Sequence, residues 1–240
     1  MSHRVFIERL SQLEARLLEM SATVERFVRS SMDFALDGTG SARDILDIDK
    51  VIDAEEVAIE EEAIELLALH QPMAVDLRLL VTILKINSDL ERIGDHAVNI
   101  TKAAKRLRET PQRPAIPPEL EEMNTIALGM LRDSLDALVH RNIEEAEDVR
   151  LRDDRVDRLH ESVFRIMLTH MLDSNISACL QVILMGRNLE RIADLATNIA
   201  EDVVFMVKGI MVRHGGRAPG VERDEQTEDV AVSRDGDENA

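Results

Sequence analysis

Paired carboxylates at helical spacing are the residues of this chain best suited to chemistry. Asp49 and Asp53 are four residues apart, and so are Glu91 and Asp95, with Asn99 four residues further along. Residues four apart lie one above the other on a helix face. Carboxylate and amide oxygens suit hard divalent cations such as Mg²⁺, Ca²⁺ or Mn²⁺, with iron or zinc as further options. The residue types therefore predict cation binding.

The second half of the chain repeats this arrangement. The block Leu90–Ile100 returns ninety-nine residues later as Leu189–Ile199, with eight of eleven positions identical, and a shorter echo relates residues 49–53 to 153–157. The corresponding candidate ligands in the second half are Asp153, Asp157, Glu190, Asp194 and Asn198. Such a repeat favours two copies of one structural unit.

The numbering predicts that the two pairs of each half meet. In the first half, both pair midpoints lie about 20 residues from a turn near Gln71, or roughly 30 Å along a helix. In the second half, both lie about 18 to 19 residues from a turn near Asp173. Four carboxylates at one level repel one another, so we expect a cation between them. The alternative is a solvated acidic surface, which is the usual meaning of a single such pair.

Residues beside the carboxylates are weaker candidates. Arg92 and Arg191 directly follow the glutamates, which turns them about a quarter of the way around the helix, so we do not expect them to neutralise the clusters. Glu56 and His160 occupy matching positions, three residues after Asp53 and Asp157. Each could add a ligand, although a plain surface role is the commoner meaning of such a residue.

Helices are the elements expected to carry these residues. Apolar residues recur at helical spacing in six segments, which are approximately 5–36, 41–70, 73–108, 119–140, 143–171 and 174–212. Residues 110–118 contain four prolines and are typical of a linker. We therefore predict an all-α fold of two tandem three-helix bundles, residues 1–109 and 119–213. Residues 214–240 lack periodicity and are expected to form a disordered acidic tail.

Composition restricts the function further. The net charge of −18 argues against direct nucleic-acid binding and favours cations or basic protein surfaces as partners. Aromatic residues make up only 2%, so the core must be aliphatic. The single cysteine, Cys179, cannot form an intrachain disulfide and fits a reducing compartment. No signal segment or membrane span is evident, so we expect a cytoplasmic protein that contacts membranes only through partners.

Four segments together resemble the PhoU family, the accessory regulators of bacterial high-affinity phosphate transport. They are Glu-Arg-Ile-Gly-Asp-His-Ala-x-Asn-Ile at 91–100, its second copy at 190–199, Gln-Pro-x-Ala-x-Asp-Leu-Arg at 71–78, and Asp-x-x-Ile-Asp at 49–53. The resemblance covers about residues 5–212. It implies multinuclear metal clusters, and by position it assigns the ligand role to both sets of carboxylates, with Asn99 and Asn198 as additions.

The same resemblance implies the partners. Similar proteins are homodimers that bridge the ATP-binding subunit of the phosphate ABC importer and the phosphate-sensing histidine kinase, holding that kinase in check when phosphate is plentiful. This sequence departs from the pattern at Ala193, which replaces the motif glycine, and at residues 173–175, which replace the Asp-Leu-Arg-like segment. A weaker or differently shaped second site is therefore expected.

Two other function classes remain open. A metal-free helical scaffold would use its acidic faces only to dock a basic partner. A di-iron carboxylate enzyme would need a Glu-x-x-His motif on each of two helices, and the nearest approach is Asp157–His160. The leading expectation is a regulator without enzymatic activity.

Overall fold

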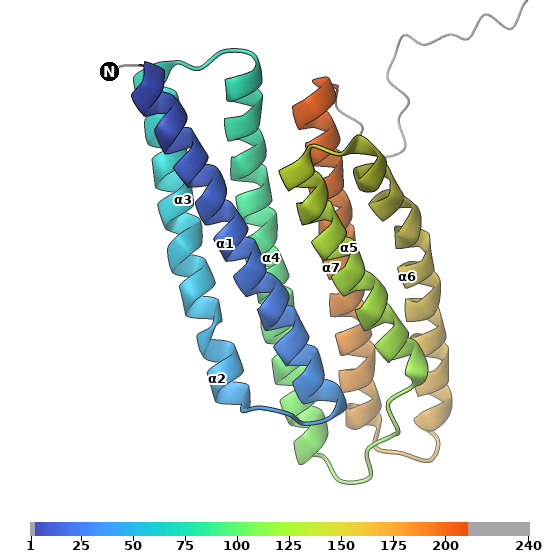
Figure 1. Cartoon of the computed structure of the whole chain (residues 1–240). Coiled ribbons are helices and arrows are strands. Elements are labelled where there is room, and N and C mark those ends of the chain that lie inside the picture. Colours follow the sequence, from blue (N-terminus) through green and yellow to red (C-terminus); the bar gives the residue numbers. More distant parts are fainter. Residues whose placement is uncertain (1–2, 211–240) are drawn as a thin grey trace, which may run out of the picture.

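This computed structural model describes residues 3–210, which form seven α-helices and the connections between them. The helices are α1 (His3–Leu36), α2 (Ala42–Asp47), α3 (Asp49–His70), α4 (Val75–Glu109), α5 (Pro118–His140), α6 (Ile143–His170) and α7 (Ile176–Lys208). One bundle holds α1 to α4 and the other α5 to α7, with α4 beside α7 where the bundles meet (Figure 1). The predicted all-α fold of two tandem three-helix bundles is confirmed. The predicted tail, 214–240, lies outside the described residues.

The second predicted helix is interrupted at Ile48, which separates α2 from α3. There the backbone N–H of Ile48 donates to the carbonyl of Ile45, three residues back, at 3.2 Å. The interruption places Asp49 in the first turn of α3. A carboxylate is favoured there because the first turn carries the positive end of the helix macrodipole.

The last helix ends at Lys208, short of the predicted Val212, because Gly209 caps it in the left-handed region at φ 71°. Glycine adopts this conformation without steric cost, which makes it the commonest residue just beyond a helix end. Val212 itself lies outside the described residues. The predicted beginnings and ends of the other helices agree with the structure to within two residues.

The core is aliphatic and continuous across both bundles. Helix α1 buries Phe6, Leu10, Leu13 and Leu17 at the spacing that the sequence predicts. Two of the five phenylalanines stay outside this core, so Leu, Ile, Val, Ala and Met fill most of it. Cys179 is fully buried, and burial raises the pKa of its thiol, which makes the thiol unreactive.

Helices α4 and α7 run antiparallel along the contact between the bundles (Figure 1). Near one end of this contact, Lys85 Nζ lies 2.6 Å from Asp202 Oδ1, and the Asp202 side chain is only 7% exposed. Further along, His96 Nδ1 lies 2.9 Å from Asn188 Oδ1. Polar contacts therefore supplement apolar packing between the bundles.

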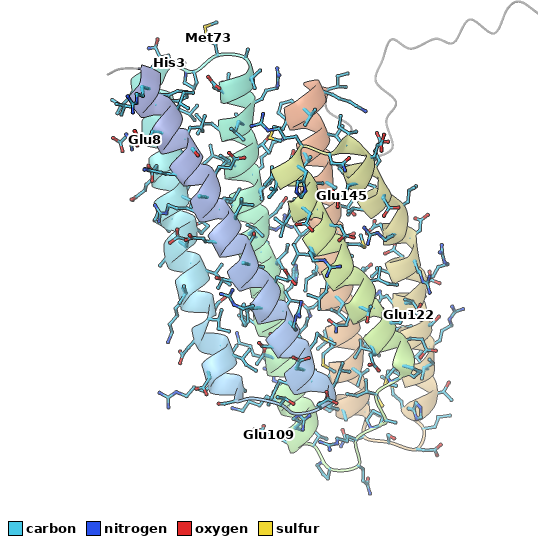
Figure 2. All side chains as sticks on the ribbon, viewed as in Figure 1. His3, Glu8, Met73, Glu109, Glu122 and Glu145 are labelled. Carbon is cyan, nitrogen blue, oxygen red and sulfur yellow. The ribbon has the colours of Figure 1, made fainter. Side chains whose placement is uncertain are left out.

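The turns lie at the two ends of the molecule. Figure 2 shows Met73 projecting from the α3–α4 turn, away from the helices. At the opposite end, residues 110–117 connect α4 to α5, and the backbone N–H of Asn175 donates to the carbonyl of Gln112 at 3.2 Å. The connection therefore packs against the α6–α7 turn. None of the helices in the described part of the chain offers an apolar stretch of bilayer-spanning length.

Candidate functional site

The first carboxylate cluster is built by the antiparallel helices α3 and α4. Asp49 and Glu91 are partly buried, and Asp53 and Asp95 are exposed. The backbone of Gly94 comes close to Asp49, since a Cβ added to this glycine would lie 3.9 Å from Asp49 Oδ1. The two helices therefore bring their acidic residues to one level, as the numbering predicts.

The carboxylates of this first cluster disfavour one another's charged forms. Burial raises the pKa of Asp49, followed by the negative charges of Asp53 and Asp95. Burial also raises the pKa of Glu91, followed by Asp95 and by Glu56 one turn beyond Asp53. A positive charge near these oxygens would stabilise all of the ionised forms together.

The second cluster lies between α6 and α7 and is the more strongly perturbed. Burial raises the pKa of Asp153 from 3.8 to about 6, followed by the charges of Asp194 and Asp157. Within residues 3–210, no hydrogen-bond partner reaches the buried Oδ1 of Asp153. The hydroxyl of Thr197 lies close enough to offset part of the rise but does not complete that hydrogen bond. An unpaired buried oxygen of this kind fits a cation ligand.

The remaining acids of the second cluster face each other across the same two helices. Burial raises the pKa of Asp157, and the charges of Glu190 and Asp194 raise it further. Nearby, His160 Nδ1 lies 3.5 Å from Glu190 Oε2. His160 also opposes the rise of the pKa of Asp157.

The two arginines behave differently from each other. Arg92 turns away from the first cluster and pairs with Asp89 at 3.3 Å, in agreement with the prediction. The corresponding prediction for Arg191 is wrong, because its Nη1 lies 2.8 Å from Asp194 Oδ2. Arg191 and Asp194 are three residues apart, which makes them neighbours on one face of α7, so the arginine side chain reaches this carboxylate.

Two further residues near the clusters were not anticipated from the sequence. Lys102 opposes the pKa rise of Asp49, and Thr197 does the same for Asp153. Both follow a ligand candidate at helical spacing, Lys102 seven residues after Asp95 and Thr197 three after Asp194. Extending the spacing rule from acids to all polar residues would have found them.

The second cluster opens into a pocket of about 860 Å³ between the bundles. Asp153, Asp194 and Asn198 line it from the second bundle, and Lys85 and Arg92 from α4. The amide of Asn198 is therefore available to a group bound in this pocket. Asn99, its counterpart, lies exposed one turn beyond Asp95 on α4.

The donor set fits a divalent cation, although the side chains are not gathered around one point. In the described part of the chain, no three His, Cys, Asp or Glu side chains form a ready-made metal site. Repelling carboxylates are expected to spread apart, so a binding cation has to draw them inward. The buried Oδ1 of Asp153 and the all-oxygen donors Asp49, Asp53, Glu91 and Asp95 support the fit.

Ala193, the departure from the glycine of the repeated block, does not obstruct the second cluster. Its side chain is fully buried. At the equivalent Gly94, an added Cβ would lie 3.4 Å from Ile52 Cδ1, which is ordinary van der Waals contact. The helices therefore accommodate a methyl group at this position, and a weaker second site does not follow from Ala193.

Known proteins resemble this chain over most of its length. Residues 17–104 and 120–203 each match the PhoU domain. The chain is 36% identical to the phosphate-specific transport system accessory protein PhoU homolog of Clostridium acetobutylicum, covering 88% of this chain and 98% of that protein. It is 38% identical to the protein of the same name from Caulobacter vibrioides, covering 84% and 89%.

Solved structures agree. The crystal structure of PhoU from Pseudomonas aeruginosa superimposes with a TM-score of 0.82 at 35% identity, covering 85% of this chain and all of that one. The phosphate transport system regulatory protein PhoU from Streptococcus pneumoniae gives a TM-score of 0.80 at 29% identity, covering 87% and 100%. Both repeats of the sequence, the helical architecture and these relatives agree that the chain belongs to the PhoU family.

Proposed function

We propose that this chain is an accessory regulator of phosphate transport that holds divalent metal ions at its two carboxylate clusters. The regulatory part rests on family membership, because the curated relatives are named for the phosphate-specific transport system. The metal part rests on one observation, the convergence of desolvated carboxylates from neighbouring helices in both halves. We infer a binding and regulatory protein, not an enzyme.

Desolvation is the physical reason for a cation at these clusters. A carboxylate that loses water without gaining hydrogen bonds is destabilised in its charged form. A bound cation supplies positive charge and contacts the desolvated oxygens directly, so it offsets both the burial and the mutual repulsion. The protein residues that would hold it are Asp49, Asp53, Glu91 and Asp95 in the first site and Asp153, Asp157, Glu190 and Asp194 in the second, with Asn99 and Asn198 as further oxygen donors. Mg²⁺ and Mn²⁺ match these donors best, and Fe²⁺ and Zn²⁺ are further candidates.

We also infer the partners from the family. The chain is proposed to bridge the ATP-binding subunit of the phosphate importer and the phosphate-sensing histidine kinase, as a homodimer, and to repress the starvation response when phosphate is plentiful. The net charge of −18 supports contact with basic protein surfaces. Contact with the membrane is then indirect, through these partners.

Elemental analysis of purified full-length protein tests the metal sites. We expect stoichiometric divalent metal after equilibration with Mn²⁺ and desalting. The double variants Glu91→Gln/Asp95→Asn and Glu190→Gln/Asp194→Asn should each lose the metal of one half. The control Glu121→Gln/Asp136→Asn removes two charges from exposed positions of α5 and should keep all of the metal. Wild-type protein without metal would instead favour a metal-free scaffold that docks a basic partner.

Deletion of the gene tests the regulatory role separately. We expect phosphate-starvation genes to stay active in high phosphate, and a copy of the wild-type gene to restore repression. Normal repression in the deletion strain would exclude the proposed regulatory function. Complementation with the two site variants then reports whether regulation depends on the clusters.

A further inference from the structure

Glu56 and His160 are structurally equivalent residues of the two halves, and they differ in donor chemistry. Glu56 follows Asp53 on α3 and acts on Glu91 of α4 through its charge. His160 follows Asp157 on α6, and its Nδ1 lies 3.5 Å from Glu190 Oε2 of α7. Each half therefore places one further side chain, from the same position, near its glutamate.

The imidazole of His160 occupies space that a glycine leaves open. A Cβ added to Gly186 on α7 would lie 3.4 Å from His160 Cδ2, so the ring packs directly over this residue. In the first half the equivalent of Gly186 is Asn87, which is buried and whose Nδ2 donates to the carbonyl of Glu56 at 2.9 Å. Where the second half has His160 in place of Glu56, it therefore also has Gly186 in place of Asn87.

Packing limits the positions that this ring can take. His160 and Glu190 are each 22% exposed, so neither side chain extends freely into solvent. Leu120 Cδ1 and Val163 Cγ1 each lie 3.6 Å from the same added Cβ and enclose the space beside the ring. The Nδ1 of His160 lies 3.5 Å from Glu190 Oε2, so the polar edge of the ring is directed to this acid of the second cluster.

We propose that His160 makes the second cluster a mixed nitrogen and oxygen site for a borderline transition metal ion such as Zn²⁺, whereas Glu56 leaves the first an all-oxygen site for Mg²⁺ or Mn²⁺. This inference rests on the proposed metal-binding function. Imidazole nitrogen favours zinc, iron, nickel and copper, and carboxylates alone favour magnesium, calcium and manganese. The two halves of a duplicated fold then differ in the ion they select.

Exchange of the two residues tests the proposal. Full-length protein stripped of metal is titrated with Zn²⁺ and, separately, with Mn²⁺ in competition with a chromogenic chelator. We expect one tight Zn²⁺ site in wild-type protein. The variants His160→Glu and His160→Gln should weaken it by about tenfold or more, since even loss of an outer partner of a metal ligand costs about 10–100-fold. Mn²⁺ affinity should change much less, and Glu56→His should add a second tight Zn²⁺ site.

Controls separate the direct role of His160 from folding and from stray zinc binding. His140→Gln removes an exposed histidine at the end of α5 and should leave Zn²⁺ affinity unchanged. Co²⁺ substitution adds a spectroscopic readout, because the absorption bands of the bound ion should change when His160→Gln removes a nitrogen donor. Thermal unfolding of the metal-free variants checks their folding, and Glu56→His keeps the test available if the His160 variants do not fold.

The possible results distinguish the role of His160 from the proposed metal-binding function. Wild-type Zn²⁺ affinity in folded His160→Gln, with no gain from Glu56→His, would overturn the role of His160 while leaving the carboxylate sites standing. If wild-type protein binds neither Zn²⁺ nor Mn²⁺, the proposed metal-binding function itself fails. Loss of the tight Zn²⁺ site in both His160 variants, together with the gain from Glu56→His, supports the proposal.

Discussion

Replacing Asp153 by asparagine should stabilise the metal-free protein and at the same time reduce its stabilisation by metal. Asp153→Asn keeps the shape of the side chain and removes a negative charge that burial destabilises. An ordinary surface acid would give neither effect. The two opposite effects in one variant are therefore specific to a desolvated metal ligand.

The pKa of Asp153 sets the size of the first effect. Its rise from 3.8 to about 6 corresponds to about 3 kcal/mol at 1.36 kcal/mol per pKa unit. Asp153 keeps part of its surface in water, so screening reduces the expected gain to about 1.5 kcal/mol. For a chain of this length such a gain raises the melting temperature by about 3–6 °C.

The pH dependence has a definite sign. Below pH 3.8 the carboxyl is neutral in both the folded and the unfolded chain, so it does not weaken the wild-type fold. As the pH rises through about 6, the folded protein must ionise a group that the unfolded chain ionises more easily, and stability is lost. The advantage of Asp153→Asn should therefore appear between about pH 4 and pH 7 and stay constant above that range.

Thermal unfolding followed by circular dichroism measures both effects. At a metal concentration of about 100 times Kd, each filled site adds about 2.7 kcal/mol to the free energy of unfolding. The variant should lose the part contributed by the second site. Asp136→Asn, an exposed change on α5, is the charge-matched control. A less stable metal-free variant would refute the burial argument, and an undiminished gain from metal would refute the ligand role.

Two further predictions concern the scaffold. Lys85→Met leaves the buried Asp202 without its partner at 2.6 Å, which should lower the free energy of unfolding in urea by about 1–3 kcal/mol. Adding Asp202→Asn should recover part of the loss. If the effects of the two substitutions simply add, the pairing is contradicted. The side chain of Asn142 caps α6 by accepting hydrogen bonds from the backbone N–H groups of Glu144 and Glu145. Asn142→Ala should therefore lower the unfolding free energy by about 1 kcal/mol, whereas Asn142→Ser should retain most of the stability of the wild-type protein.

The fold could be predicted from the sequence because its signals are local and repeated. Apolar residues such as Leu13 and Leu17 recur at helical spacing and are buried as expected. Four prolines mark the connection between the bundles. The break at Ile48 could not be predicted, because neither glycine nor proline marks it and the residue keeps helical dihedral angles.

The level of the carboxylates was also predictable, since it follows from counting residues to each turn. The positive partners lie at helical spacing as well, so a spacing rule extended from acids to all polar residues predicts them, whereas a rule for acids alone does not. Arg191 bends along α7 to Asp194, and Lys102 acts on Asp49 from the neighbouring helix. His160 packs over Gly186 because α6 and α7 lie against each other. The sequence of either helix alone does not predict this contact.

Arg191 does not offset the burial of the acids in the second cluster, and the reason lies in the order of the causes of the pKa rises. Burial is the largest cause of the pKa rise at Asp49, Glu91, Asp153 and Asp157, ahead of any neighbouring charge. Arg191 already lies 2.8 Å from Asp194, yet the pKa of Asp153 remains near 6 and its Oδ1 remains unpaired. Charge supplied from one side reduces repulsion but does not restore the lost hydration of the oxygens. A cation that contacts the oxygens would do both, and this difference supports the proposed direct coordination over ion pairing alone.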